Sequence, residues 1–425
     1  AYDVNWNKSF PSTWNKTITF RTTTSLTSDI VLNSADETIS FVATAADCGV
    51  VSSSRLYFKP SSNLQIESGT YSFGGDIVVA GTLSVSGAML KNAQRYIQVG
   101  SGGNGTVTIG PGGVYENFGN LGSLMVAHTS GHSGTLNVAG GTVSISGWLT
   151  MCYNASSVSA AVNVTDGGVL AVKRLVLGNA GTSGGVVTLD GGTLRAYADE
   201  SPFVDAHDSL RVYAGANGAT FDSNGKTITI AESIEDKSGE AGVVRFTGGG
   251  TITLSGTPSY TGGTTNVAGT VLSLTTAAKS AIVAHPVVVE IPAAGAVDGT
   301  VVFEVTDGGT FSQSEVDAMV VTGTDASRYA LVLAYGGTKV VISDTLAGEY
   351  VWNDGASAAS WKTAGKWSKN NVAGNWYDST AAVFANAGDA VTVDADVTAA
   401  SVTFRADATV GGAATLKVPV VDVAS

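Results

Sequence analysis

Charged side chains that could act as general acids and bases gather in one part of this sequence. Carboxylates grouped on one face with lysine, arginine or histidine are what hydrolysis or elimination on polysaccharides requires. The candidates are Asp199, Glu200, Asp205, His207, Asp208 and Arg211, with Lys173 and Arg174 one repeat earlier. Charged residues make up only 13% of the chain and no catalytic motif accompanies the group. We therefore expect a solvated loop with turn-forming aspartates, no catalytic residues and no enzymatic activity.

Two histidines in one short segment, His128 and His132, raise the question of a metal site. Their spacing brings two imidazoles together on a helix, but here it lies in AHTSGHSG, which is typical of a loop. Stacked aspartate turns could bind calcium, but the glycine-rich nonapeptide pattern of such turns is absent. We predict no metal and no cofactor.

The chain has seven tryptophans, and four of them lie from Trp352 onward. Exposed aromatic faces can form a platform for sugars, whereas tryptophans clustered in one module form a small core or are buried at a contact between chains. We favour a core or a contact and leave the sugar platform as the alternative. The candidates for self-assembly are Trp6, Trp14, Trp352, Trp361, Trp367 and Trp376.

The motif Asn-X-Ser/Thr, the acceptor of N-linked glycans in hosts with that machinery, occurs five times. Chance matches are expected in a chain so rich in these residues, so ordinary surface asparagines are the alternative. The candidate sites are Asn7, Asn15, Asn104, Asn154 and Asn163.

The element that must position all these residues is a repeat. Glycine pairs begin at Gly112, Gly140, Gly167 and Gly191, at nearly even intervals. Short segments between them alternate aliphatic and small polar residues, as strands with one buried face do. Units of this length bury their faces only by stacking on neighbours. The pattern predicts an all-β solenoid.

Composition limits the function further. The net charge of −13 is spread along the chain without basic clusters, which argues against nucleic-acid binding. No apolar run approaches the ~18 residues of a spanning helix, so we expect no membrane insertion. Cys48 and Cys152 would lie about four coils apart, too far for a disulfide, so we expect two buried thiols. Only Ser312 to Met319 reads as a helix of one or two turns.

One segment resembles a known family. GGGTITLSGTPSYTGGTTNVAGTVLSL, from Gly248 to Leu274, is similar to the autotransporter-associated β-strand repeat of large bacterial surface proteins. The resemblance implies a right-handed parallel β-helix that is exported to the cell surface, and it implies no catalytic residues. The start at Ala1 also resembles a mature secreted protein, so we expect an extracellular or cell-surface location after removal of a signal peptide.

We divide the chain into four parts. Residues 1–73 are expected to be an N-terminal cap with first strands, and residues 74–280 a regular solenoid that loosens into longer loops between Phe203 and Glu240. Residues 281–349 read as terminal solenoid strands, and residues 350–425 as a Trp-rich C-terminal β module, a possible assembly domain.

The leading functional hypothesis is a non-enzymatic structural protein of a bacterial surface that assembles head to tail with copies of itself into a fibre or coat, because open solenoid ends expose unpaired strand edges. The alternative is a surface adhesin or carbohydrate-binding passenger protein that contacts surface glycans through loops between Asp199 and Glu240. A piece of a longer tandem array is a further alternative.

Overall fold

The structure is a computed structural model. It describes residues 16–27, 29–32, 38–93, 95–119, 122–154, 159–178, 184–344, 349–369, 372–376, 378 and 380–423. The chain forms two compact units, residues 1–288 and 289–425.

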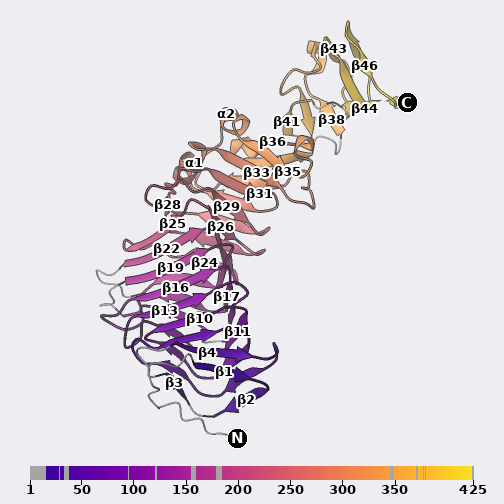
Figure 1. Cartoon of the computed structure of the whole chain (residues 1–425). Helices are drawn as coiled ribbons and strands as arrows, with labels where there is room; N and C mark the ends of the chain where they lie inside the picture. The colour runs from indigo at the N-terminus through magenta and orange to yellow at the C-terminus, as the bar shows by residue number, and fades with distance from the viewer. Residues whose placement is uncertain are drawn as a thin grey trace. The chain divides into compact units, whose positions relative to one another are not determined.

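The first unit is a coil in which each turn, here called a rung, contributes one strand to each of three parallel sheets, except that the last rung adds none to the first sheet (Figure 1). The first sheet contains β1 (Lys16–Phe20), β4 (Thr38–Ala43), β7 (Asn63–Ile66), β10 (Thr82–Val85), β13 (Gly105–Ile109), β16 (Gly134–Ala139), β19 (Ser159–Thr165), β22 (Gly184–Asp190), β25 (Leu210–Ala214) and β28 (Ile234–Asp236). The second contains β2 (Thr23–Leu26), β5 (Gly49–Ser52), β8 (Gly69–Phe73), β11 (Ala88–Asn92), β14 (Val114–Asn117), β17 (Thr142–Ile145), β20 (Val169–Val172), β23 (Gly192–Ala196), β26 (Ala219–Asp222), β29 (Val244–Thr247) and β31 (Thr264–Val267). The third contains β3 (Ile30–Leu32), β6 (Leu56–Phe58), β9 (Ile77–Val79), β12 (Ile97–Val99), β15 (Leu124–Val126), β18 (Trp148–Met151), β21 (Arg174–Leu177), β24 (Glu200–Val204), β27 (Thr227–Ile230), β30 (Thr251–Leu254) and β32 (Val271–Leu274). The predicted parallel β-helix is confirmed.

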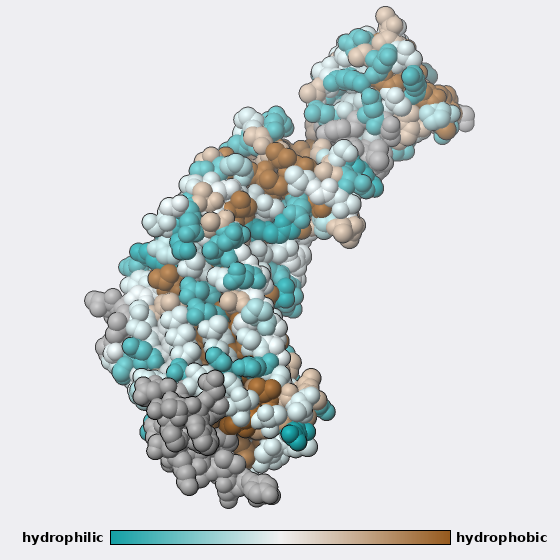
Figure 2. Space-filling model, viewed as in Figure 1, coloured by the Kyte–Doolittle hydropathy of each residue, from teal (hydrophilic) through white to brown (hydrophobic). Residues whose placement is uncertain are grey.

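Ladders of buried aliphatic residues hold the rungs together. One runs through the first sheet, where each member pairs with the equivalent residue of the next rung and every side chain is buried. Its members are Leu83, Val107, Leu136, Val162, Val187 and Val212. Between them, small polar residues face outward, as the alternation predicts. On the face shown in Figure 2, hydrophilic and near-neutral residues accordingly cover most of the first unit.

The glycine pairs have two separate roles at the corner between the first and second sheets. The first glycine takes a positive φ, as at Gly167 (75°) and Gly191 (75°), a conformation that L side chains rarely adopt. The second glycine lies against the rung before it: a Cβ on Gly168 would lie 2.2 Å from the carbonyl oxygen of Val138. The pair therefore turns the chain and lets two rungs approach.

Two boundaries differ from those expected. The described strands of residues 16–73 already belong to the three sheets, so the coil includes β1 and these strands form no separate cap. The segment from Phe203 to Glu240 does not loosen: β24 to β28 continue the ladders, with a register shift between Glu200 and Val204. Its polar residues sit at outward positions of strands and turns, which hid the strand pattern.

One helix was not predicted. After β32 the chain forms α1 (Thr276–Val283), which is capped by Thr275 Oγ1 accepting from the Ala278 backbone N–H at 3.1 Å. Ala278, Lys279 and Ile282 are its buried residues. Alanine and threonine are also common in the strands of this chain, so the sequence of α1 did not stand out as helical.

The two cysteines are buried and free, as predicted. Cys48 lies just before β5 and Cys152 just after β18. These strands belong to the second and sixth rungs, so four rungs separate the thiols.

The second unit begins within β33 (Val287–Ile291) and changes to antiparallel pairing. β37 pairs antiparallel with both β34 and β36. The predicted helix is confirmed as α2, where Ser312 and Glu315 form a capping box. Residues 281–349 are therefore not purely solenoid strands. The elements are β34 (Val301–Val305), α2 (Gln313–Asp317), β35 (Val320–Gly323), η1 (Ala326–Arg328), β36 (Tyr329–Ala334), η2 (Tyr335–Gly337) and β37 (Lys339–Asp344).

The C-terminal β module has a core of tryptophans, and its later strands return to parallel pairing. Trp352, Trp361 and Trp367 are fully buried, and Trp376 is nearly so. Later strands pair in parallel, with Val391 of β43 opposite Val410 of β45. The elements are β38 (Glu349–Trp352), η3 (Gly355–Ser357), β39 (Ala359–Ser360), β40 (Trp367–Lys369), β41 (Val372–Gly374), β42 (Thr380–Phe384), β43 (Asp389–Val393), β44 (Val397–Phe404), β45 (Ala408–Gly412), β46 (Leu416–Lys417) and β47 (Val421–Val423).

Candidate functional site

The structure brings together part of the predicted charged group. Arg174 donates two hydrogen bonds to Asp205, at 2.9 and 2.8 Å. Glu200 lies 3.6 Å from the Lys173 ammonium and 3.8 Å from the Arg174 guanidinium. Two cations of one rung thus neutralise two carboxylates of the next. These four side chains form an ion-pair network in which each carboxylate faces a cation.

The remaining members of that group bond to the backbone. Asp199 accepts a hydrogen bond from the Thr227 N–H at 2.7 Å. His207 Nδ1 accepts from the Ser209 N–H at 3.0 Å, and Arg211 donates to the carbonyl oxygen of Asp208 at 2.9 Å. These bonds stabilise turns between strands.

His128 is a packed side chain rather than half of a histidine pair. Its ring stacks on Tyr153 with centroids 5.3 Å apart, and its Nδ1 lies 3.2 Å from Ser101 Oγ. Burial lowers the pKa of His128, and the nearby Asp76 partly opposes this. His132 bonds through its backbone N–H to the carbonyl of Thr129. Within the described ranges, no group of three potential ligands surrounds either ring.

The candidate glycosylation sites differ from one another. Asn104 and Asn154 are exposed in turns. Asn163 lies inside β19 and donates to the Asn137 Oδ1 at 2.9 Å, which makes it part of a polar ladder on the sheet. Its amide is therefore a structural group. Asn7 and Asn15 lie outside the described residues.

The tryptophans expected to mediate assembly are core residues. Trp361 and Trp376 pack edge to face with centroids 5.2 Å apart, and Trp367 Nε1 donates to the carbonyl of Trp361 at 2.7 Å. Because these four rings fill the module's own interior, they present no surface to a second copy. Trp352, Trp361, Trp367 and Trp376 are thus core residues of the module, and assembly through them stays a prediction. Trp6 and Trp14 lie outside the described residues.

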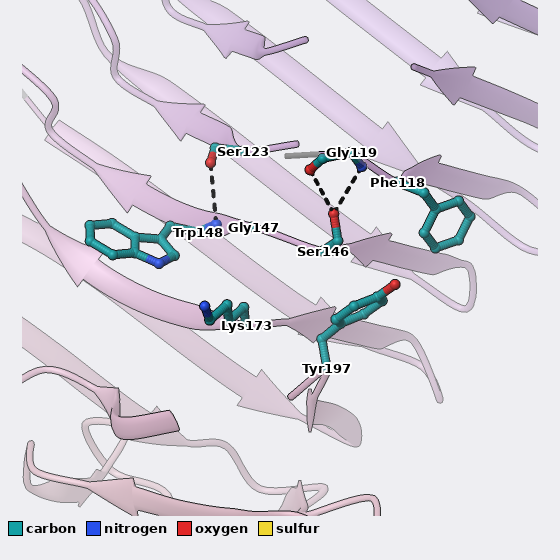
Figure 3. Close-up of a pocket in the computed structure, with 8 residues that line it drawn as sticks. All are labelled: Phe118, Gly119, Ser123, Ser146, Gly147, Trp148, Lys173 and Tyr197. Carbon is teal, nitrogen blue, oxygen red and sulfur yellow. Dashed lines mark hydrogen bonds between the residues drawn. The ribbon is translucent and has the colours of Figure 1, made fainter. Parts of the chain in front are cut away.

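Exposed aromatic residues lie elsewhere, around Trp148, which no sequence motif marked. A groove of about 490 Å³ lies on one side of this residue (Figure 3). Phe118 and Tyr197 stand on its other side, with their rings 6.4 Å apart. The groove is lined by Phe118, Gly119, Ser123, Ser146, Gly147, Trp148, Lys173 and Tyr197.

Four successive rungs build this groove. Phe118, Ser146, Lys173 and Tyr197 each follow directly after a strand of the second sheet, namely β14, β17, β20 and β23. The aromatic residues therefore begin at the outer two rungs, and a hydroxyl and an ammonium come from the rungs between them. At ~4.8 Å per rung, the outer two rungs are about 14 Å apart, so the two rings lean toward each other across this span.

A second groove, of about 500 Å³, shares Trp148 with the first. It crosses β18 and β21, and Thr150, Tyr153 and Asn154 also line it. Trp148 is 43% exposed, Phe118 49% and Tyr153 46%. Its lining is Trp148, Thr150, Tyr153, Asn154, Val176, Leu177 and Gly178.

Local contacts fix Trp148 between the two grooves. It begins β18 at an outward position, next to the buried Leu149. Its backbone N–H donates to Ser123 Oγ at 3.3 Å, and the Arg174 guanidinium carbon lies 5.0 Å from the centroid of its indole ring. Gly147 has no room for a side chain, since a Cβ would lie 2.3 Å from the Gly122 carbonyl oxygen. The indole therefore packs against Arg174 and still remains partly exposed.

The chemistry of these grooves is that of aromatic faces beside neutral hydrogen-bonding groups. Aromatic rings offer flat apolar surfaces, and Ser146, Thr150 and Asn154 supply hydroxyl and amide groups. A molecule with both C–H faces and hydroxyls fits this combination. The sequence signal was a large aromatic at an outward strand position, where the repeat otherwise has small polar residues.

In the part of the chain that the structure describes, no helix is long and apolar enough to cross a membrane. Comparison of the chain with models of protein families, with curated proteins and with solved structures gave no match.

Proposed function

We propose that this chain is a non-catalytic, extracellular β-helix that binds glycan chains in the two grooves beside Trp148. The observation that carries the proposal is the exposure of this indole between grooves that also contain Phe118, Tyr197 and Tyr153. A cluster of exposed aromatic rings on a protein surface marks a site of interaction with a ligand or partner. The extracellular location is part of the proposal and draws on the resemblance of Gly248 to Leu274 to a secreted repeat.

Sugars suit this site better than an apolar partner does. The ring C–H groups of a sugar can lie on the exposed indole of Trp148, while its hydroxyls reach Thr150 and Asn154. Neighbouring polar side chains are already held in place: Ser146 Oγ both donates to and accepts from the Gly119 backbone at 3.1 Å. A site whose groups are fixed before binding loses little entropy when it is filled.

The test is glycan-array binding by the wild-type protein and by Trp148→Ala. We expect the wild type to bind a subset of glycans, and the variant to bind them at least about 10-fold more weakly, since one anchoring aromatic is worth at least ~1.4 kcal/mol. The matched control is Tyr335→Ala, which removes an exposed aromatic that lies outside both grooves. Absence of binding by the folded wild type, or equal binding by Trp148→Ala, would overturn the proposal.

Head-to-tail assembly into a fibre or coat stays a prediction. The burial of the four C-terminal tryptophans removes the apolar surface on which it was expected to depend. Negative-stain micrographs of the purified protein would test it independently of glycan binding.

A further inference from the structure

We propose that the two grooves beside Trp148 distinguish the units of one glycan chain, and that the groove containing Lys173 takes a unit with an anionic group. The inference rests on the proposed function and names the class of glycan. It follows from a difference in charge between the two grooves, which have Trp148 in common.

Lys173 is the charged residue among the eight described residues that line the first groove. The seven described residues that line the second groove are all neutral. A chain lying across Trp148 would therefore meet an ammonium group on one side and only hydroxyl, amide and apolar groups on the other. An acidic unit on the first side and a neutral unit on the second match this arrangement.

The ammonium of Lys173 is placed to receive a ligand. Its side chain is 42% exposed, and its distance of 3.6 Å from Glu200 is longer than a hydrogen bond. Arg174, by contrast, already donates two hydrogen bonds to Asp205. A carboxylate or sulfate in the groove can therefore accept a hydrogen bond from Lys173 without breaking one that Glu200 receives from it.

Position supports the same assignment. Lys173 occupies the third of four equivalent sites on successive rungs, after Phe118 and Ser146 and before Tyr197. The rings of Phe118 and Tyr197 can hold the face of a sugar, and the ammonium of Lys173, on the Trp148 side of Tyr197, then lies within reach of a substituent on that sugar. Figure 3 shows Lys173 between Trp148 and Tyr197.

The experiment uses the full chain and an array of carboxylated, sulfated and neutral oligosaccharides, together with carboxyl-reduced counterparts of the acidic ones. We expect the bound glycans to be anionic and their carboxyl-reduced counterparts to bind more weakly. Lys173→Gln should lower affinity for the acidic glycan roughly three-fold, as loss of a partly exposed ion pair does, and leave affinity for the reduced glycan unchanged. Added salt should weaken wild-type binding to the acidic glycan and have little effect on the variant.

Lys237→Gln is the matched control. Lys237 is similarly exposed, at 44%, and it also lies near a glutamate, Glu240 at 3.1 Å, but it lines neither groove. This variant should bind as the wild type does. If the wild type binds neutral and acidic glycans equally, or if Lys173→Gln changes nothing, the inference is wrong while the proposed function stands. If the wild type binds no glycan, the proposed function itself fails.

Discussion

Arg174 lies over the indole of Trp148 while its guanidinium is held by the carboxylate of Asp205. Three rungs are joined in this way, because Trp148 begins β18, Arg174 begins β21 and Asp205 follows β24. The arrangement links the exposed ring of Trp148 to a part-buried ion pair. The orientation of the ring therefore depends on a residue that touches neither groove.

The interaction between Arg174 and Asp205 can be measured. We expect Arg174→Gln to lower the free energy of unfolding by roughly 1–2 kcal/mol, because Asp205 loses two charge-assisted hydrogen bonds. Asp205→Asn should cost a similar amount, and the double variant less than the sum of the two. Urea unfolding of the four proteins gives the coupling energy. Additive losses would show that the two side chains act independently.

Substituting the first or the second glycine of a pair should lower stability by different amounts. Gly168→Ala forces a Cβ to within 2.2 Å of the Val138 carbonyl, so we expect a loss of about 1–3 kcal/mol from overpacking. Gly167→Ala meets no atom within 4 Å and should cost only the positive φ, about 1 kcal/mol. Gly184→Ala, whose nearest neighbour would be 3.4 Å away, is the control. Thermal unfolding ranks the three, and a Gly168→Ala variant as stable as the control would contradict the role assigned to this close approach.

The C-terminal module should depend on its aromatic core. Trp367 is fully buried and contacts Trp352, with ring centroids 5.1 Å apart. Trp367→Ala removes this ring, and we expect a loss of about 3–5 kcal/mol in the module. Limited proteolysis should then cut between residues 350 and 423 and spare the coil of residues 16–288. Protection of the module equal to that of the wild type would show that Trp367 is dispensable for its fold.

His128 should make stability depend on pH. Its pKa in the folded protein is lowered by burial, so the unfolded chain, with a pKa near 6.5, binds more protons in mildly acidic solution. Stability is therefore full above about pH 6.5, falls as the pH drops through the window between the two pKa values, and levels off below the folded pKa. Urea unfolding between pH 8 and pH 4.5 measures this, with His128→Asn as the comparison. An equal decline in the variant would assign the effect to other groups.

Much of the fold could be predicted because it repeats locally. Glycine pairs and alternating residues recur within a few positions of each other, and a strand or turn is decided by such neighbours. The prediction failed where polar residues stood on outward strand positions, as at Glu200 and Glu235, and where alanines served a helix, as at Ala278. In both cases the type of secondary structure depended on packing against neighbouring rungs, and the local sequence pattern contains no information about that packing.

The candidate site was predicted in part. The sequence analysis placed Arg174 one repeat before the group that contains Asp205, but it predicted neither their ion pair nor the aromatic grooves. Phe118 and Tyr197 follow β14 and β23 and are far apart in the sequence, yet their rings lie 6.4 Å from each other. Rungs differ in length, since the step from Val107 to Leu136 is longer than that from Leu136 to Val162, so counting residues does not align outward positions.

For the regular repeats, the sequence by itself determined that the chain forms a solenoid, where the turns lie and which residues face the interior, since these follow from alternation and from glycine at positions that admit no side chain. Tertiary structure decided which outward residues meet: it buried the C-terminal tryptophans in one module and left Trp148 exposed between two grooves. The physical reason is that inward residues are selected by the strand period alone, whereas outward neighbours depend on the register between rungs, which loops of unequal length set.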